Sequence, residues 1–534
     1  MNRSRCWSTS SILALLLAGC ADPSGQAASV PEHANPRGAL PLSSAAPPAP
    51  AATADERIQW QTWEAAAFET ARQQDRLVLL FMMAPWAGPD PFAKPESALR
   101  ALVQERYVPI VVDPLRRPDI ARRYGPAGWP ALAVTLSDGR LVAIATDIPR
   151  ANIHKYLLSL ANHYRDRRQE VERRVNAFRP LSHGSGSRSP VSAAALYDDV
   201  VAAYDAVQGG FGTGVKFPET SVVHFLLSYY DHQRDEEALA IALRNLEILS
   251  SAPMWEEERG GVLSYSFTSD WLSPIMEKDG ADQAGLLRAL LYAGQLTGEL
   301  SSAPVSGLLA YIRGQLFNAE TGAFYSRQVQ RNQGGQQPAW WTDPTVYTDK
   351  HALLVMACLS AGWVEVHGSE AVEMGLAGAD YMSQRCVRAD GAVYHYVTES
   401  GPRVPGLLDD QMLAARALWE AYRVSGREQF AAATRRIVAW TETNLYDAQE
   451  RAFTDRVADA AVPSWQPAIR FTDLEVPSGN ATAAALYLLM GQQDKTSNLL
   501  EGRMFDSPAV PRRAHATHGI SLMRWQSMME GAQQ

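Results

Sequence analysis

The sequence predicts a multidomain protein, in which a small α/β domain precedes a larger all-α domain built as a ring of helix pairs. Two observations carry this prediction. Between residues 55 and 165, apolar runs of strand length alternate with helical segments. After residue 191, a polar stretch that suits a helix N-terminus precedes about four turns of mainly apolar sequence, and this pattern recurs at intervals of roughly 60 to 70 residues.

The composition fits a folded protein and excludes one class of partner. The 534 residues are 46% hydrophobic, which supplies ample material for large cores. The formal net charge is −9 and no basic stripe is present, so we expect no nucleic acid partner.

Residues 1–19 are predicted to be a lipoprotein signal peptide. Arg3 and Arg5 precede a short apolar run that cannot span a bilayer. The following Leu17-Ala18-Gly19-Cys20 resembles the bacterial lipobox, which is cut before a cysteine that becomes lipidated; an ordinary signal peptide with a chance cysteine is the alternative. Because Ala21 and not an aspartate follows Cys20, the lipobox resemblance implies an anchor on the periplasmic face of the outer membrane.

Two further segments read as connections. Residues 20–54 hold the lipidated cysteine and a tether rich in Ala, Pro and Ser, and residues 166–190 hold a helix end and a Gly/Ser linker. Only Cys358 and Cys386 remain in the mature fold, and their spacing does not decide whether they form a disulfide in an oxidising periplasm.

The first domain, residues 55–165, has a thioredoxin-like order of elements: strand, helix, strand, then a hairpin and a closing helix after a proline turn. The expected elements are Leu77–Met83, Pro95–Glu105, Tyr107–Val112, Ala131–Thr135, Leu141–Thr146 and a helix from Arg150.

The second domain, residues 191–534, is predicted to be an (α/α)6 toroid of roughly twelve helices. Its inner helices follow polar mouths that begin at Lys216, Ser273, Tyr347, Leu407 and Val476. Outer helices are expected at Glu236–Ser250, Ala303–Phe317, Glu370–Gln384 and Glu428–Asn444, and Arg512–Met529 closes the ring.

Several motifs resemble the thioredoxin-domain family of spermatogenesis-associated protein 20 and its bacterial relatives. The first domain carries the matching Trp63, Val112-Asp113 and Gly128-Trp129-Pro130. The second carries Gly209-Gly210-Phe211-Gly212 with Lys216-Phe217-Pro218, Pro274-Ile275-Met276-Glu277-Lys278 with Asp282, Asp409-Asp410, and Pro477-Ser478-Gly479-Asn480. The resemblance implies a thioredoxin-like domain fused to a toroid similar to six-hairpin glycosidases and to N-acylglucosamine epimerases. It also implies a cis peptide bond before Pro130.

Two departures from the family pattern weaken the case for catalysis. Ala84 and Ala87 stand where the family has the two cysteines of a CxxC motif, and thiol exchange needs both an attacking and a resolving thiol. We therefore expect a redox-inactive thioredoxin-like domain. Ile275 stands where the family has a histidine, and an isoleucine cannot transfer a proton. His351 and His224 could replace it, although a histidine on an apolar helix is typical of a core residue.

Sugar sites in such rings combine carboxylates with aromatic faces. The catalytic candidates are Glu277, Asp282, Asp409 and Asp410. The ligand-binding candidates are Lys216, Tyr265, Trp271, Lys278, Asp349 and Asn480, with Trp340, Trp341 and Trp465 as further platforms. Structural roles remain open for all of them, since Asp349 and Asp409 stand at N-cap positions and the tryptophans could be core.

Two hypotheses about function follow. The first is an envelope lipoprotein whose toroid binds a glycan or a protein partner without catalysis. The second is a carbohydrate-active epimerase, isomerase or hydrolase that uses carboxylates at the toroid mouth. The sequence contains no metal motif and no phosphate-binding loop, so no metal and no cofactor are expected.

Overall fold

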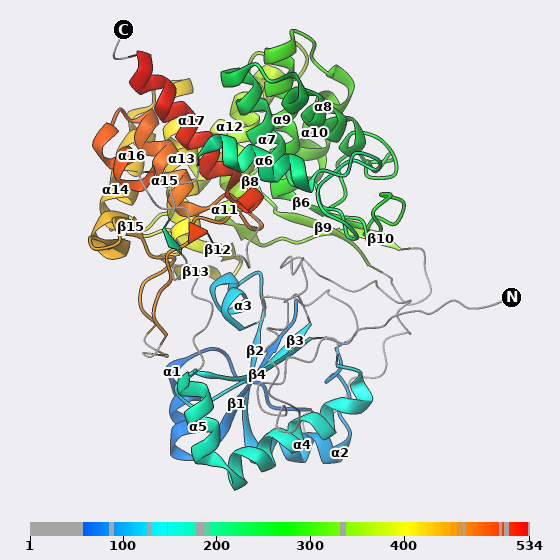
Figure 1. Ribbon diagram of the computed structural model, residues 1–534, viewed down its shortest axis with the longest axis vertical. Helices are drawn as coiled ribbons and strands as arrows, with labels where there is room; N and C mark the ends of the chain where they lie inside the picture. The colour runs from blue at the N-terminus through cyan, green and yellow to red at the C-terminus, as the bar shows by residue number, and fades with distance from the viewer. Residues whose placement is uncertain are drawn as a thin grey trace, which may run out of the picture. The chain divides into compact units, whose positions relative to one another are not determined.

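The computed structural model describes residues 57–84, 90–124, 130–146, 148–177, 187–188, 192–331, 338–459, 461–462, 465–500, 505–506 and 512–531. The signal peptide, Cys20, the tether, Ala87 and the bond between Trp129 and Pro130 lie outside these residues. The chain divides into two compact units (Figure 1). The first comprises Met1–Ser182, Asn332–Gln337 and Ala458–Pro467, and the second comprises the remainder. None of the described helices combines the length and apolar character that a transmembrane span requires.

The first unit is a four-stranded mixed sheet flanked by helices, which confirms the thioredoxin-like domain. The strands are β1 (Leu77–Met82), β2 (Tyr107–Val112), β3 (Ala131–Thr135) and β4 (Leu141–Thr146), in the order β2-β1-β3-β4. Strand β1 runs parallel to β2 and antiparallel to β3. The helices are α1 (Ala65–Gln73), α2 (Ser97–Arg106), α3 (Pro118–Tyr124), α4 (Arg150–Asp166) and α5 (Arg168–Ala177).

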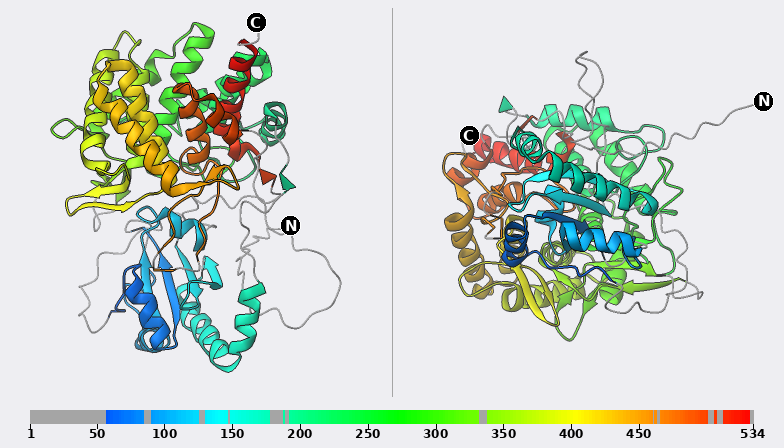
Figure 2. Two further views of the ribbon diagram at one scale, coloured as in Figure 1. Left: turned by 90° about the vertical axis from the view of Figure 1, so that its left-hand side faces the viewer. Right: turned by 90° about the horizontal axis from the view of Figure 1, so that it is seen from below.

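Every residue of β1 is buried, because helices cover both faces of the sheet. Alternate residues point to opposite sides: Leu79 packs in a core with residues of α2, α4 and α5, whereas Leu80 packs in a core with residues of α1 and α3. The left panel of Figure 2 shows helices on both sides of the sheet. The continuous apolar run of β1 in the sequence is explained by this two-sided burial.

A segment from the far end of the sequence completes the second of these cores. Trp465 makes an edge-on contact with Trp63, at 5.8 Å between ring centroids, and it also contacts Tyr124. The Arg123 guanidinium lies over the Trp465 ring, 5.2 Å from its centroid. Asp459 accepts a hydrogen bond of 3.0 Å from the Trp63 indole. The segment Ala458–Pro467 is therefore part of the thioredoxin-like unit, although the toroid sequence surrounds it.

The second unit consists of alternating outer and inner helices. The outer helices are α6 (Ala193–Ala203), α8 (Glu236–Leu249), α10 (Ser302–Tyr311), α12 (Gly368–Tyr381), α14 (Glu428–Leu445) and α16 (Gln493–Leu500). The inner helices are α7 (Thr220–Gln233), α9 (Gly280–Thr297), α11 (Thr348–Ser360), α13 (Leu408–Ser425), α15 (Gly479–Leu489) and α17 (Ala516–Gly531). Single π-helical turns continue α10 and α12, over Ile312–Leu316 and Met382–Cys386, and a 3₁₀ turn, Arg512–His515, precedes α17.

The inner helices close into a ring. Each of them contacts the next one along the chain, and α17 contacts α7. Helix α11 is buried nearly all round, because it packs against two inner neighbours and an outer helix. This closed arrangement confirms the predicted (α/α)6 toroid.

Because each outer helix returns the chain, all inner helices begin at one end of the ring, which we call the mouth. Short strands lie in the connections that lead there: β6 (Glu277–Asp279), β7 (Phe317–Asn318), β8 (Ala323–Phe324), β9 (Arg327–Arg331), β10 (Ala339–Thr342), β11 (Val346–Tyr347), β12 (Tyr394–Thr398), β13 (Gly401–Pro405), β14 (Tyr446–Asp447) and β15 (Ala452–Phe453). A further pair joins β5 (Ser187–Arg188) to β16 (Phe505–Asp506).

One hydrogen-bonding arrangement recurs at the start of four inner helices and explains the repeated pattern in the sequence. In each case a buried polar side chain near the helix start hydrogen-bonds to the backbone of the preceding connection. We call such a side chain a pin. The pins join Gln283 to Val262, His351 to Phe324, Gln411 to Val393, and Asn480 to Phe453. The pinned residue follows, by one or two positions, a residue with positive φ: Gly261, Gly322, Gly391 or Arg451.

Candidate active site at the mouth of the ring

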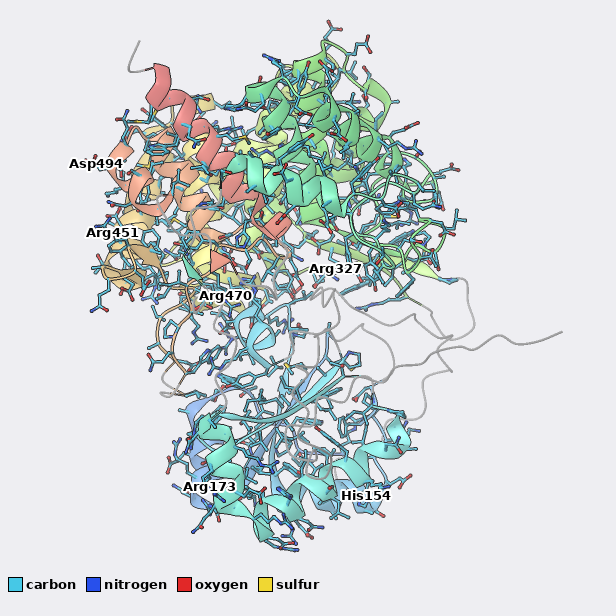
Figure 3. The ribbon with its side chains drawn as sticks, viewed as in Figure 1. His154, Arg173, Arg327, Arg451, Arg470 and Asp494 are labelled. Atoms are coloured by element: carbon cyan, nitrogen blue, oxygen red, sulfur yellow. The ribbon has the colours of Figure 1, made fainter. Side chains whose placement is uncertain are left out.

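Charged side chains gather at the mouth from the first turns of the inner helices. Asp279 caps α9, Asp349 and Lys350 open α11, and Asp409 and Asp410 open α13. Arg327 joins them from β9, at the end of the toroid that carries the strands (Figure 3). Polar residues at these positions satisfy the free N–H groups of the helix ends, which is why the sequence places them just before the apolar runs.

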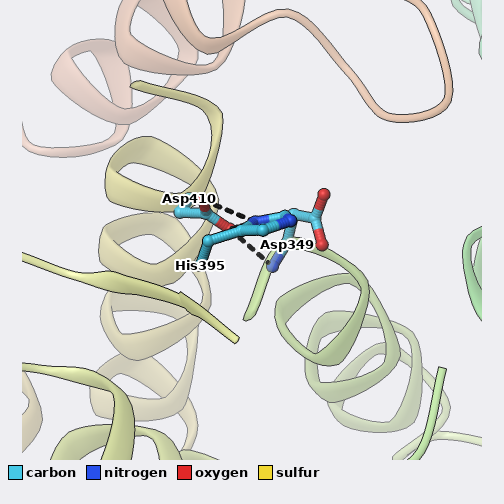
Figure 4. Close-up of side chains that lie close together, drawn as sticks. All are labelled: Asp349, His395 and Asp410. Carbon is cyan, nitrogen blue, oxygen red and sulfur yellow. Dashed lines mark hydrogen bonds and ion pairs between the residues drawn. The ribbon is translucent and has the colours of Figure 1, made fainter. Parts of the chain in front are cut away.

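The most compact group is formed by Asp349 on α11, His395 on β12 and Asp410 on α13 (Figure 4). One oxygen of Asp410 lies 2.9 Å from Nδ1 of His395, and its other oxygen accepts a hydrogen bond of 3.1 Å from the backbone N–H of Asp349. One potential ligand atom from each residue lies within 4.8 Å of the others. All three residues are buried. We call this group the acid cluster.

Burial and mutual repulsion raise the pKa values of the two carboxyl groups of the acid cluster. Burial raises the pKa of Asp410 from 3.8 to about 7; His395 opposes this shift, and Asp349 and Asp409 add to it. Burial also raises the pKa of Asp349, against the attraction of His395 and Lys350. The raised pKa of Asp410 places its titration near neutral pH, which suits a general acid or base.

A second charged network lies beside the acid cluster and is almost fully paired. One oxygen of Asp279 accepts hydrogen bonds from Arg327, at 2.7 Å, and from Lys350 Nζ, at 2.5 Å. Arg327 also forms a short ion pair with Glu277, and Lys350 Nζ lies 3.8 Å from Glu475. These pairs hold the starts of α9 and α11 together and leave little proton-transfer capacity in Glu277.

The four predicted catalytic residues thus have different surroundings. Glu277 is neutralised by Arg327. Asp282 is buried as the third residue of α9, equivalent to Asp410 in α13. Asp409 accepts a hydrogen bond of 2.9 Å from the backbone N–H of Gly479, so it caps the neighbouring α15. Asp410 belongs to the acid cluster, and so does Asp349, which the sequence favoured as a ligand-binding or capping residue.

Most predicted ligand-binding side chains are engaged inside the protein. The two lysines are fully buried: Lys216 bonds Asp205, and Lys278 bonds Glu256 and lies 4.5 Å from the centroids of Tyr311 and Trp340. Asn480 is a pin. Trp271 is buried and donates its indole N–H to Gln208, and buried Tyr265 packs against Phe217.

The remaining aromatic candidates also have identified contacts. Arg331 stacks on Trp341, 3.3 Å from the ring centroid. The expectation of a sugar platform at Trp465 is not supported, since this side chain is buried in the thioredoxin-like unit. Ala84 is buried at the end of β1, and Pro130 precedes β3. Cys358 and Cys386 are both buried free thiols, and burial raises the pKa of each to about 12.

Sequence reasoning missed His395, Asp279, Lys350 and Arg327. His395 had a usable signal, because it occupies the buried face of β12 between Val393 and Val397, where a polar residue is unexpected in a strand with period-two burial. The ion pairs of Asp279 have no such signal in the sequence. Their partners, Arg327 on β9 and Lys350 on α11, come close to Asp279 only when the ring folds.

The acid cluster also has the residue types of a small metal centre. Two carboxylates and an imidazole suit several divalent ions, and the three ligands come from three separate elements, so no sequence motif marks them. Each would have to be deprotonated to bind a cation, and His395 Nδ1 instead faces Asp410 at hydrogen-bond distance. The geometry of the described residues fits a shared proton directly.

Comparison with known proteins agrees with the family resemblance. Residues 42–181 match the family model Thioredox_DsbH, described as Protein of unknown function, DUF255. Human spermatogenesis-associated protein 20 is 26% identical over 306 residues, which cover 51% of this chain and 38% of that protein. The mouse protein is 24% identical over 308 residues, with the same coverage. The resemblance is confirmed, and the match spans well under half the length of these relatives.

Solved structures align with 63% of this chain at low identity. D-mannose isomerase aligns with a TM-score of 0.48 and 12% identity, over 63% of this chain and 97% of its own. Cellobiose 2-epimerase from Spirochaeta thermophila aligns with a TM-score of 0.47 and 14% identity, over 63% of this chain and 96% of its own. Values this low carry no argument about chemistry.

Proposed function

We propose that the toroid mouth is an acid–base active site that transfers a proton on a neutral, polyhydroxylated ligand such as a sugar. The observation that supports this most strongly is the buried Asp410 carboxyl, with a pKa of about 7, between His395 and the start of α11. A carboxyl with this pKa is present in both protonation states at neutral pH.

Asp349 is the group that meets the ligand in this proposal. Its exposed fraction is 7%, against 1% for Asp410 and 2% for His395, so the latter two are positioning residues behind it. His395 lies between the two carboxyl groups (Figure 4) and can hold a proton for either. The close approach of these groups leaves no room for the water of an inverting glycosidase, so isomerisation or epimerisation fits better than inverting hydrolysis.

The charge at the mouth favours a neutral ligand. The mouth carries the carboxyl groups of Glu277, Asp279, Asp349, Asp409, Asp410, Asp473 and Glu475. Arg327 and Lys350 are the permanent cations that pair with them. An anionic sugar would meet net repulsion there, whereas hydroxyl groups would find many acceptors.

We further propose that the chain is held in the cell envelope by a lipid on Cys20 and that its thioredoxin-like domain has no redox activity. The lipobox and the loss of both cysteines at Ala84 and Ala87 support these two proposals. In an insulin-reduction assay, the protein is expected to reduce insulin no faster than buffer alone. In cells fed labelled fatty acid, the wild type is expected to carry the label and the Cys20→Ser variant to lack it.

The direct test is solvent-proton exchange. The protein is incubated in D₂O with a panel of neutral aldoses, ketoses and disaccharides, and NMR follows deuterium at carbon together with new anomers. The wild type is expected to exchange deuterium into at least one sugar, and Asp349→Asn is expected to lose this by at least about a hundredfold. Asp494→Asn, an exposed aspartate on α16, is the matched control and retains the exchange.

Three other outcomes decide against the proposal. A sugar that binds with no exchange or turnover favours the binding hypothesis, in which the mouth recognises a glycan without catalysis. Activity that EDTA removes and a divalent metal restores assigns the acid cluster to a metal. Equal exchange by wild type and Asp349→Asn places the chemistry elsewhere.

A further inference from the structure

Three arginines occupy the same position on alternate inner helices. Arg288, Arg416 and Arg524 are each the ninth residue of their helices, α9, α13 and α17. In the closed ring, α9, α13 and α17 are the second, fourth and sixth inner helices, so they stand around the ring axis with approximate threefold symmetry. The sequence repeat alone does not require this, because the ninth residues of α7, α11 and α15 are Ser228, Met356 and Tyr487.

Electrostatic interactions link these side chains across the ring. Arg288 interacts with Arg416 and Arg524, and Arg524 interacts with Arg416. All three guanidinium groups lower the pKa of His224 on α7, although α13 lies on the opposite side of the ring. Side chains from four inner helices therefore lie within electrostatic range of one another, and the His224 ring also stacks on Tyr292 of α9 at 6.1 Å between centroids. Helix geometry places this level about 9 Å deeper than Asp410, six residues further along α13.

The positive charge of this group is only partly compensated. Glu420 pairs with Arg416 at 3.1 Å, and Arg524 shares a hydrogen bond with Tyr292, whose hydroxyl also bonds Asp231. Arg288 has no hydrogen bond or ion pair with another described residue, and burial together with its like-charged neighbours lowers its pKa to about 10. Nε2 of His224 is buried and has no hydrogen-bond partner among the described residues.

We propose that Arg288, Arg416, Arg524 and His224 form a binding site for a tetrahedral oxyanion, a phosphate or sulfate group, on the ring axis below the mouth. Guanidinium groups that approach from three helices match three oxygens of a tetrahedron better than one planar carboxylate. The neutral His224 can donate from Nε2 to the same anion. A bound anion would compensate the like charges that the fold otherwise brings together at a cost.

This site is independent of the proposed proton transfer, since none of its residues belongs to the acid cluster. Arg288 and Arg416 are partly exposed and Arg524 is exposed, so an ion from solvent can reach them. The probe is inorganic phosphate, with sulfate as a second tetrahedral ion and acetate as the planar comparison, all at equal ionic strength.

The experiment measures binding of each ion to the full chain by calorimetry and by the shift of the unfolding midpoint. Phosphate and sulfate are expected to bind and raise the midpoint, and acetate to have little effect. Arg288→Met is expected to weaken phosphate binding by at least about tenfold, because a charge-assisted hydrogen bond is lost. The same variant should unfold no more readily than wild type without phosphate, since a repulsive charge is gone. Arg423→Met, an exposed arginine on α13, is the matched control.

Should Arg288→Met fail to fold, Arg524→Met tests the same prediction at an exposed position. The proposal is overturned if wild type shows no phosphate-dependent shift, if acetate binds as well as phosphate, or if both arginine variants bind phosphate like the wild type. Loss of phosphate binding with sugar exchange unchanged would separate this site from the acid cluster.

Discussion

The charge state of Asp410 leads to a stability prediction at the scale of a single residue. Its pKa rises from 3.8 to about 7 in the folded protein, so the folded state holds a proton that the unfolded state releases. The contribution of Asp410 to stability is therefore complete below about pH 4 and is lost as the pH rises through 7. Asp473, with a pKa raised to about 6, acts in the same direction.

Asp410→Asn keeps a neutral side chain at every pH and so removes this dependence. The difference in unfolding free energy, variant minus wild type, is expected to increase between about pH 4 and pH 7, by an amount on the order of a few kcal/mol. Urea titrations across this range measure the difference. A constant difference, as expected for the exposed control Asp494→Asn, would show that Asp410 is ionised throughout.

The histidines show what the sequence could and could not reveal at this scale. The apolar surroundings of His351 in the sequence predict a core residue, and the structure shows it bonding the backbone of Phe324 and Gly378. The period-two burial of β12 marks His395 as unusual, but its pairing with Asp410 cannot be read from the sequence, because Asp410 is contributed by a different element. Residue types and local periodicity are visible in a sequence, whereas the pairing of side chains from separate elements depends on packing.

The pins account for the repeat at the scale of the element. Asn480 accepts from the N–H of Phe453, and its amide donates to the carbonyls of Phe453 and Arg470. Asn480→Leu conserves volume and leaves these buried backbone groups without partners, at about 1–3 kcal/mol each. We expect a loss of at least about 3 kcal/mol in urea unfolding.

The control for this prediction is Asn444→Leu on the outer helix α14, where the asparagine is exposed and bonds only Trp440 within its own helix. It should change the unfolding free energy by less than about 0.5 kcal/mol. Equal effects of the two substitutions would contradict a special role for the pins.

Alanine substitutions at two glycines with positive φ, Gly391 and Gly426, would show how tightly the connections pack against neighbouring helices. A Cβ on Gly391, at φ +100°, would lie 2.3 Å from the carbonyl oxygen of Arg436 on α14, whereas a Cβ on Gly426, at φ +69°, meets open space. Both alanine variants carry backbone strain, and only Gly391→Ala adds a clash with backbone. Thermal unfolding should show Gly391→Ala to be the more destabilised by at least about 1 kcal/mol. Similar midpoints would indicate that α14 can move away.

At the scale of the whole molecule, the sequence predicts both domains because each has its own periodicity. The first has apolar runs of strand length, and the second has polar stretches that each precede an apolar helix. It did not predict that Ala458–Pro467 belongs to the first unit. Inside the toroid sequence this segment reads as an ordinary connection before the PSGN motif. Its role depends on Trp63, nearly four hundred positions earlier in the chain (separation 396 from Asp459), and no local pattern encodes such a contact.

Trp465→Ala tests this contribution. The buried ring contacts Trp63, Tyr124 and Arg123, so its removal is expected to cost about 3–5 kcal/mol within the thioredoxin-like unit. Hydrogen exchange should accelerate in α1 and α3, whose residues share this core, and remain unchanged in the inner helices α9, α11 and α13. Trp363→Ala, at an exposed tryptophan, is the control. Unchanged exchange in α1 and α3 would mean that the unit is complete without the segment, and a chain ending at residue 182 should then fold with undiminished stability.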